Sequence, residues 1–116
     1  MALTKITSGV ISQEFQAGQT LITASGTIDI DWNSAQVFNL TPNQNTTFTF
    51  SDYKIGMVKI IVIIGTGGSK TLNFPTTADI LGGEYDDATG VKNFVQIVCT
   101  DDSSTPQFFY TISQPS

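Results

Sequence analysis

Apolar and polar residues alternate along most of this 116-residue chain, with the period expected for β-strands. The clearest alternation covers residues 27–32, where Ile28, Ile30 and Trp32 share one face and polar residues fill the other. No segment carries an apolar stripe at helical spacing over three turns. The pattern predicts half-buried strands, and it places Trp32 in the core rather than on a sugar-binding surface.

One segment, residues 56–64, breaks the alternation with a continuous run rich in β-branched residues. Such a run predicts a strand that is buried on both faces, at the centre of the fold. The run is too short to span a membrane as a helix. We expect a second sheet to cover one face and a neighbouring subunit to cover the other, through Met57, Ile61 and Ile63.

The other strands are predicted from shorter alternations bounded by Gly, Pro, Asn and Asp. The expected elements are a hairpin of residues 37–40 and 46–50, a tight turn at 65–68 into a strand at 70–74, a long loop at 76–92, and a closing hairpin of residues 93–100 and 107–113. Turn signals at this spacing are typical of an antiparallel β-sandwich or jelly roll. We therefore predict an all-β fold, with one domain at residues 20–116 and no internal repeat.

Residues 1–19 differ from the rest, because large apolar side chains stand among small polar residues without a regular period. These side chains are Leu3, Ile6, Val10, Ile11 and Phe15. Because five such side chains are too many to leave in water, we predict an arm that docks on a partner or on the domain. A frayed terminus or a simple edge strand is the alternative interpretation.

Composition excludes several classes of function. The chain has ten acidic residues against five Lys or Arg residues and a net charge of -5, so it lacks the clustered positive charge that nucleic-acid binding requires. The single cysteine, Cys99, cannot form a disulfide within the chain, and its apolar surroundings predict a core residue. The N-terminus has no apolar stretch of signal-peptide length, so we expect synthesis in the cytoplasm.

The residue types of the chain give little support for a catalytic site. Nucleophilic catalysis most often uses a histidine as the base, and the chain contains none. Asp29 and Asp31 lie two apart on one face of a strand, whereas the carboxylates of a glycosidase face each other across a cleft. The turn Gly65–Thr71 lacks the glycine before lysine, and the following helix, of a phosphate-binding loop. We expect neither an enzyme nor a cofactor.

Two acidic pairs, Asp86-Asp87 and Asp101-Asp102, lie in predicted loops and supply oxygen atoms suited to calcium. Neither pair stands in the Asp-x-Asp-x-Asp-Gly spacing of a calcium loop. We therefore expect no metal site.

Several segments follow one another in a characteristic order between residues 27 and 113. They are Val37–Leu40, Asn45–Phe50, the aliphatic run with Gly67-Gly68 after it, Thr71–Pro75 and Phe108–Tyr110. This order resembles the β-modules of tailed-bacteriophage virion proteins, which occur in tail fibres, head fibres and capsid decoration proteins. The opening Ala2–Ile11 also resembles the start of many phage fibre proteins. One departure is Phe74-Pro75, where these modules usually have Trp-Pro.

The resemblance implies a non-enzymatic virion protein that forms a homotrimer. Since 116 residues hold one module and an arm, we expect a capsid decoration protein on the outside of the phage head. Its partners would be further copies of the chain and the major capsid protein, which residues 2–19 would grip.

Two alternatives remain, a short tail-fibre or tail-tip receptor-binding protein and a lectin-like carbohydrate-binding domain. The lectin-like domain would need an exposed aromatic platform. In the receptor-binding protein, a host-surface glycan would contact two loops. Their candidate residues are Tyr85, Asp86, Asp87, Asp101 and Asp102.

Overall fold

The computed structural model describes residues 18–21 and 26–116, which form nine strands and no helix. The strands are β1 (Gly18–Leu21), β2 (Thr27–Asp31), β3 (Val37–Leu40), β4 (Thr46–Ser51), β5 (Val58–Ile64), β6 (Leu72–Asn73), β7 (Ala78–Gly82), β8 (Lys92–Asp101) and β9 (Gln107–Ser113). The prediction of an all-β fold is therefore confirmed. The predicted arm lies almost entirely outside the described residues.

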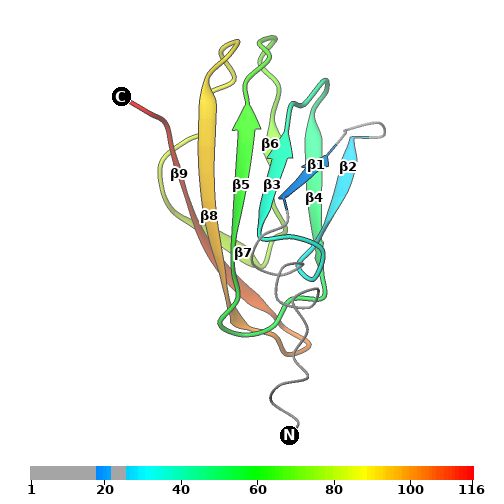
Figure 1. Ribbon diagram of the computed structural model, residues 1–116. Helices are drawn as coiled ribbons and strands as arrows, with labels where there is room; N and C mark the ends of the chain where they lie inside the picture. Colours follow the sequence, from blue (N-terminus) through cyan, green and yellow to red (C-terminus); the bar gives the residue numbers. More distant parts are fainter. Residues whose placement is uncertain (1–17, 22–25) are drawn as a thin grey trace, which may run out of the picture.

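The strands form two sheets that pack face to face (Figure 1). Sheet A has six strands in the order β1-β3-β5-β8-β9-β7, and sheet B has three in the order β2-β4-β6. Each sheet turns its apolar face towards the other, because alternate residues of a strand point to opposite sides. The result is a β-sandwich with one core.

The first six strands alternate between the sheets, and each lies parallel to the strand two places earlier. In sheet A, Val37 aligns with Gly18 and Ile60 aligns with Val37. In sheet B, Thr47 aligns with Thr27. This half of the chain is thus a two-sheet coil whose aligned positions lie 19 to 26 residues apart, an arrangement typical of a solenoid.

This arrangement shows that four predictions were wrong. The segments predicted as a hairpin are β3 and β4, which lie in different sheets, and the turn after β5 likewise leads into the other sheet. Five of the seven pairings between described strands are parallel, so the prediction of an antiparallel sandwich or jelly roll is wrong for most of the fold. The prediction of no internal repeat missed the coil, because its turns differ in length and leave no sequence repeat.

The C-terminal half agrees better with the sequence. β8 and β9 form the predicted closing hairpin and pair antiparallel, and β5 is an interior strand between β3 and β8. The predicted long loop at 76–92 is partly wrong, because it contains β7. This strand lies at the edge of sheet A, parallel to β9, and its exposed Ile80 and Leu81 give no buried-strand pattern.

The core lies between the two sheets and is mostly aliphatic and aromatic. Its buried members include Trp32, Phe38, Phe48, Ile61, Ile63, Val95, Ile97, Cys99 and Phe108. Trp32 and Cys99 are both 0% exposed, which confirms the prediction that they are core residues. Lys59 is also buried, with Nζ 3.3 Å from Gln36 Oε1.

Candidate interaction surface

The side of sheet A that faces away from sheet B is apolar at its centre. In β5, Ile61 and Ile63 point into the core, so the residues beside them point outward. The same alternation identifies the outward residues of the neighbouring strands β3, β8 and β9. The outward apolar side chains are Val37 on β3, Val58, Ile60, Val62 and Ile64 on β5, Phe94 and Val98 on β8, and Phe109 on β9. We call this set the outer apolar face.

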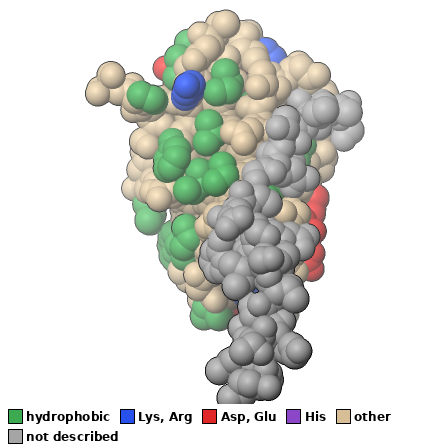
Figure 2. All heavy atoms as spheres, in the orientation of Figure 1, with side chains coloured by type: hydrophobic (Ala, Val, Ile, Leu, Met, Phe, Trp, Pro, Cys, Tyr) green, Lys and Arg blue, Asp and Glu red, His purple; other side chains and the backbone are tan. Residues whose placement is uncertain are grey.

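Strand register makes the outer apolar face continuous. Val58 aligns with Val98, which in turn aligns with Phe109, and Val62 aligns with Phe94. Val58 is 42% exposed and Phe94 is 39% exposed, so the described protein leaves much of both side chains in water. Figure 2 shows hydrophobic side chains gathered over the middle of this side of the molecule. An antiparallel or mixed sheet of a monomer usually turns a polar face to water, so this face is unusual.

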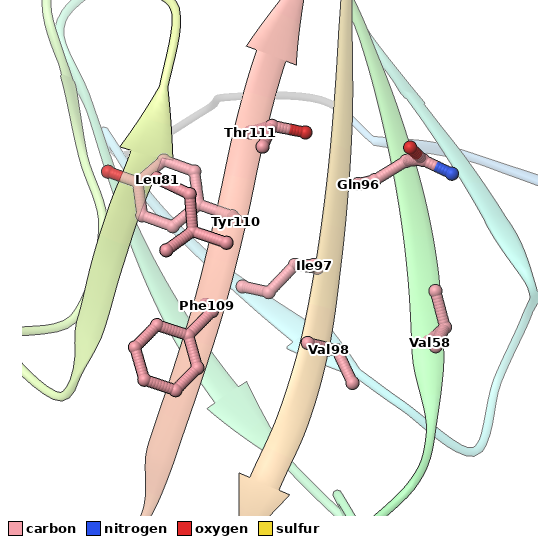
Figure 3. Close-up of a pocket in the computed structure, with 8 residues that line it drawn as sticks. All are labelled: Val58, Leu81, Gln96, Ile97, Val98, Phe109, Tyr110 and Thr111. Atoms are coloured by element: carbon pink, nitrogen blue, oxygen red, sulfur yellow. The ribbon is translucent and has the colours of Figure 1, made fainter.

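A shallow groove of about 240 Å³ crosses the outer apolar face beside β7 (Figure 3). Val58, Val98 and Phe109 line it from three adjacent strands. Leu81, which is 67% exposed, forms its rim on β7. Gln96 and Thr111 are its main polar side chains. Such a lining suits apolar side chains better than a charged ligand or a sugar.

Acidic residues are few on this side. β3, β5 and β9 contain none, and β8 contains only Asp101, at its last position. The edge strand β7 contains Asp79, which aligns with Phe109 and accepts a hydrogen bond from Gln107 Nε2 (3.0 Å). The outer side of sheet B is very different. There Asp29 accepts hydrogen bonds from Thr49 Oγ1 (2.7 Å) and Ser51 Oγ (2.5 Å), among exposed threonines. The sandwich therefore has one apolar side and one polar, acidic side.

The predicted subunit-interface residues lie elsewhere than expected. Ile61 and Ile63 are both 0% exposed, because sheet B covers them, so a neighbouring chain has no access to them. Met57 precedes β5 and packs partly against the core, where its sulfur accepts a hydrogen bond from Lys54 N (3.2 Å). The prediction chose the wrong face of β5. Once β8 is known to pair with β5, alternation within β8 identifies the buried face, because Val95 is buried and aligns with Ile61.

Tyr85, Asp86 and Asp87 lie in the loop between β7 and β8 and bond to their own chain. Asp87 accepts hydrogen bonds from the Tyr85 hydroxyl (3.0 Å) and Lys70 N (2.8 Å), and Asp86 N donates to Asn93 Oδ1 (2.8 Å). Burial, followed by the hydrogen bond to Asp87, raises the pKa of Tyr85 above its usual value. These bonds hold the loop against the turn that follows β5.

The carboxylate of Asp87 has a pKa below its usual value. Its partial burial acts in the opposite direction, but the hydrogen bonds from Lys70 N and the Tyr85 hydroxyl outweigh it. Asp87 therefore stays ionised as an internal acceptor.

Asp101 and Asp102 lie at the opposite end of the sandwich, beside the β8–β9 turn (Figure 1). Asp101 accepts a hydrogen bond from Ser103 N (2.8 Å), and Ser103 lowers the pKa of Asp101. Asp102 accepts one from Ile55 N (3.0 Å). The whole length of β8 separates this pair from Tyr85, so the structure does not bring the two predicted ligand loops together.

The described residues contain no group of three or more His, Cys, Asp or Glu side chains arranged to hold a metal ion. Asp29 and Asp31 lie near Asp52, and hydrogen bonding with Asp31, followed by the charge of Asp31, raises the pKa of Asp52. Burial raises the pKa of the Cys99 thiol above its usual value. Within residues 18–21 and 26–116, no helix is long and apolar enough to cross a membrane.

The arm residues Leu3, Ile6, Val10, Ile11 and Phe15 lie outside the described residues. Their predicted role in attachment stays a prediction. Comparison with known proteins gives no match, whether with family models, curated proteins or solved structures.

Proposed function

We propose that this chain is a non-enzymatic structural protein of a bacteriophage virion, a trimeric decoration protein bound to the outside of the head. It would be made in the cytoplasm of the bacterial host and assembled onto the major capsid protein. The observation that carries the proposal is the outer apolar face of a sandwich whose opposite side is polar. Such a face is typical of a protein that works in an assembly.

The surface chemistry supports a role outside a cell. Only 13% of the residues are charged, and the solvated side of sheet B is rich in threonine, serine and aspartate. A surface with few charges depends less on salt concentration than a highly charged one. The order of sequence segments that resembles phage virion modules supports the same assignment.

The receptor-binding alternative loses its main argument, because its two candidate loops lie at opposite ends of the sandwich. A lectin-like domain would need an exposed aromatic platform. Its candidates do not form one, because Trp32 is fully buried and Tyr53, Tyr85 and Tyr110 pack partly against the core. We therefore favour the decoration protein over both.

Immunogold electron microscopy of intact virions tests the proposal, with an antibody raised against this chain. We expect gold particles over the head, in many copies. Gold confined to the tail tip would instead establish the receptor-binding alternative. Absence of gold from intact particles, with labelling of the same protein in a disrupted lysate as the control, would refute the virion assignment.

A further inference from the structure

We infer that the outer apolar face packs against a second copy of this chain, so that copies associate through β5, β8 and β9. The inference rests on the proposed homotrimer and names the surface that forms it. The opposite, polar side of the sandwich and the loops at its two ends then stay in solvent.

The size of the face fits a whole folded partner. Strands lie about 4.8 Å apart and residues rise about 3.4 Å each. Five adjacent strands of sheet A (β3, β5, β8, β9 and β7) with four rows of outward residues therefore cover roughly 600 Å². A stable protein interface buries about 800 Å² on each partner, which this area approaches. A single extended peptide is about one strand wide, and it would leave most of the five strands uncovered.

The charge distribution fits a second copy in particular. With a net charge of -5, two copies repel each other in most orientations. Acidic residues lie away from the centre of the outer apolar face, because Asp29, Asp31 and Asp52 lie on or beside sheet B and Asp79 lies on the edge strand β7. Contact through this face keeps the acidic groups of the copies apart and removes apolar surface from water.

The shape of the outer apolar face also fits a folded partner. Leu81 projects into solvent at one edge of the groove, and Phe94 projects from β8 outside the groove. Around a threefold axis, the groove side of one copy would meet the projecting side chains of the next copy. Such head-to-tail contacts between two parts of one surface close into a ring.

The test is sedimentation equilibrium of the full chain and of two variants, Phe94→Asp and Val58→Asp. Both residues are partly exposed in the single chain, so a carboxylate there reaches water in a monomer but is buried in the oligomer. We expect a mass of three chains for the unchanged protein and of one chain for each variant. The matched control is Thr47→Asp, an exposed position of β4 on sheet B, which should leave the mass unchanged.

A second measurement does not depend on these variants folding. In Gln96→Cys, the new thiol lies on the outer face, whereas Cys99 is buried. We expect the new thiol to react with a maleimide at least tenfold more slowly when the protein is concentrated and oligomeric than after dilution. Equal rates would show that the face stays open in the oligomer and would overturn the inference.

The outcomes separate the surface from the function. A monomer at every concentration would overturn the inference. An oligomer that neither variant weakens would show that the copies meet elsewhere, which also overturns this surface. A trimer through this face that is absent from immunolabelled virions would leave the surface assigned and refute the virion function.

Discussion

At the scale of single residues, Trp32 shows how the core tolerates an imperfect site. Its indole lies 5.4 Å from the ring of Phe108 and 5.6 Å from that of Phe50, measured between ring centroids. The ring is fully buried, yet Nε1 has no hydrogen-bond partner among the residues that the structure describes. A buried donor without a partner costs about 1–3 kcal/mol, so the aromatic packing has to exceed this penalty.

Trp32→Phe should therefore change the free energy of unfolding by no more than about 1 kcal/mol, because a small cavity cost is offset by loss of the unpaired donor. Phe108→Ala, which removes a ring from the same cluster, should lower it by about 3–5 kcal/mol. Urea unfolding followed by far-UV circular dichroism measures both changes. A loss above about 3 kcal/mol in Trp32→Phe would contradict the offset between the cavity and the unpaired donor.

The carboxylates of Asp31 and Asp52 provide a second prediction at this scale. Because the pKa of Asp52 is raised in the folded protein, its ionised form destabilises the fold at pH values above that pKa. The penalty disappears below the usual pKa of the carboxyl group, where Asp52 is protonated in both the folded and unfolded states. Asp52 has a φ of 59°, a conformation that asparagine also adopts readily.

We therefore expect Asp52→Asn to raise the melting temperature at pH 7 and to have much less effect at about pH 2.5, below the usual pKa. Differential scanning calorimetry at the two pH values measures the difference. Glu84→Gln is the control, because it removes the same charge from an exposed position. An equal gain in both variants would mean that net charge, rather than Asp31, is responsible.

At the scale of elements, two adjacent glycines at the end of β7 have different surroundings. Gly83 has a φ of 88°, and a Cβ atom there would overlap the carbonyl oxygen of Ile112 on β9. Gly82 has no positive φ, and a Cβ atom there would meet nothing within 4 Å. The fold therefore requires glycine at position 83 but not at position 82.

Gly83→Ala should lower the free energy of unfolding by more than about 2 kcal/mol, because the backbone of β9 has to move. Gly82→Ala should change it by less than about 1 kcal/mol. Urea unfolding measures both, and Gly82→Ala serves as the matched control. Similar stability of the two variants would show that the close approach of Gly83 to β9 is not needed.

The sequence predicted strand positions better than strand partners. Ile28 and Ile30 are buried as their alternation requires, and the segments of β8 and β9 pair as a hairpin. Alternation records only which face of a strand is buried, and a strand of the coil buries the same face as a strand of a hairpin. The parallel partners of β3 and β4 were therefore not predictable from their own residues.

At the scale of the whole molecule, the outer apolar face was predicted only in outline. The apolar run of β5, broken only by Lys59, correctly indicated apolar residues on both faces. The particular residues were not predictable, because continuous hydrophobicity does not show which face sheet B covers. Once β8 is known to lie beside β5, Phe94 and Val98 extend the face across two strands. The arm and the face are therefore separate candidate contacts, one with the capsid and one with further copies.

The division of roles leads to a prediction for the arm. Every buried hydrophobic residue of the described core lies between Ile28 and Ile112, so deleting residues 2–17 removes none of them. We expect the truncated chain to keep the blue-shifted fluorescence of buried Trp32, yet to lose binding to phage heads that lack the protein. Cosedimentation with purified heads measures the binding.

A full-length control separates the chemistry of the arm from its length. It carries serine at all five apolar arm positions, Leu3, Ile6, Val10, Ile11 and Phe15. If apolar contacts hold the protein on the head, this variant should fail to bind, as the truncated chain does, because serine removes most of the apolar area that binding would bury. Normal binding by the truncated chain would instead assign attachment to the sandwich, and the outer apolar face would then be the first surface to test against the capsid.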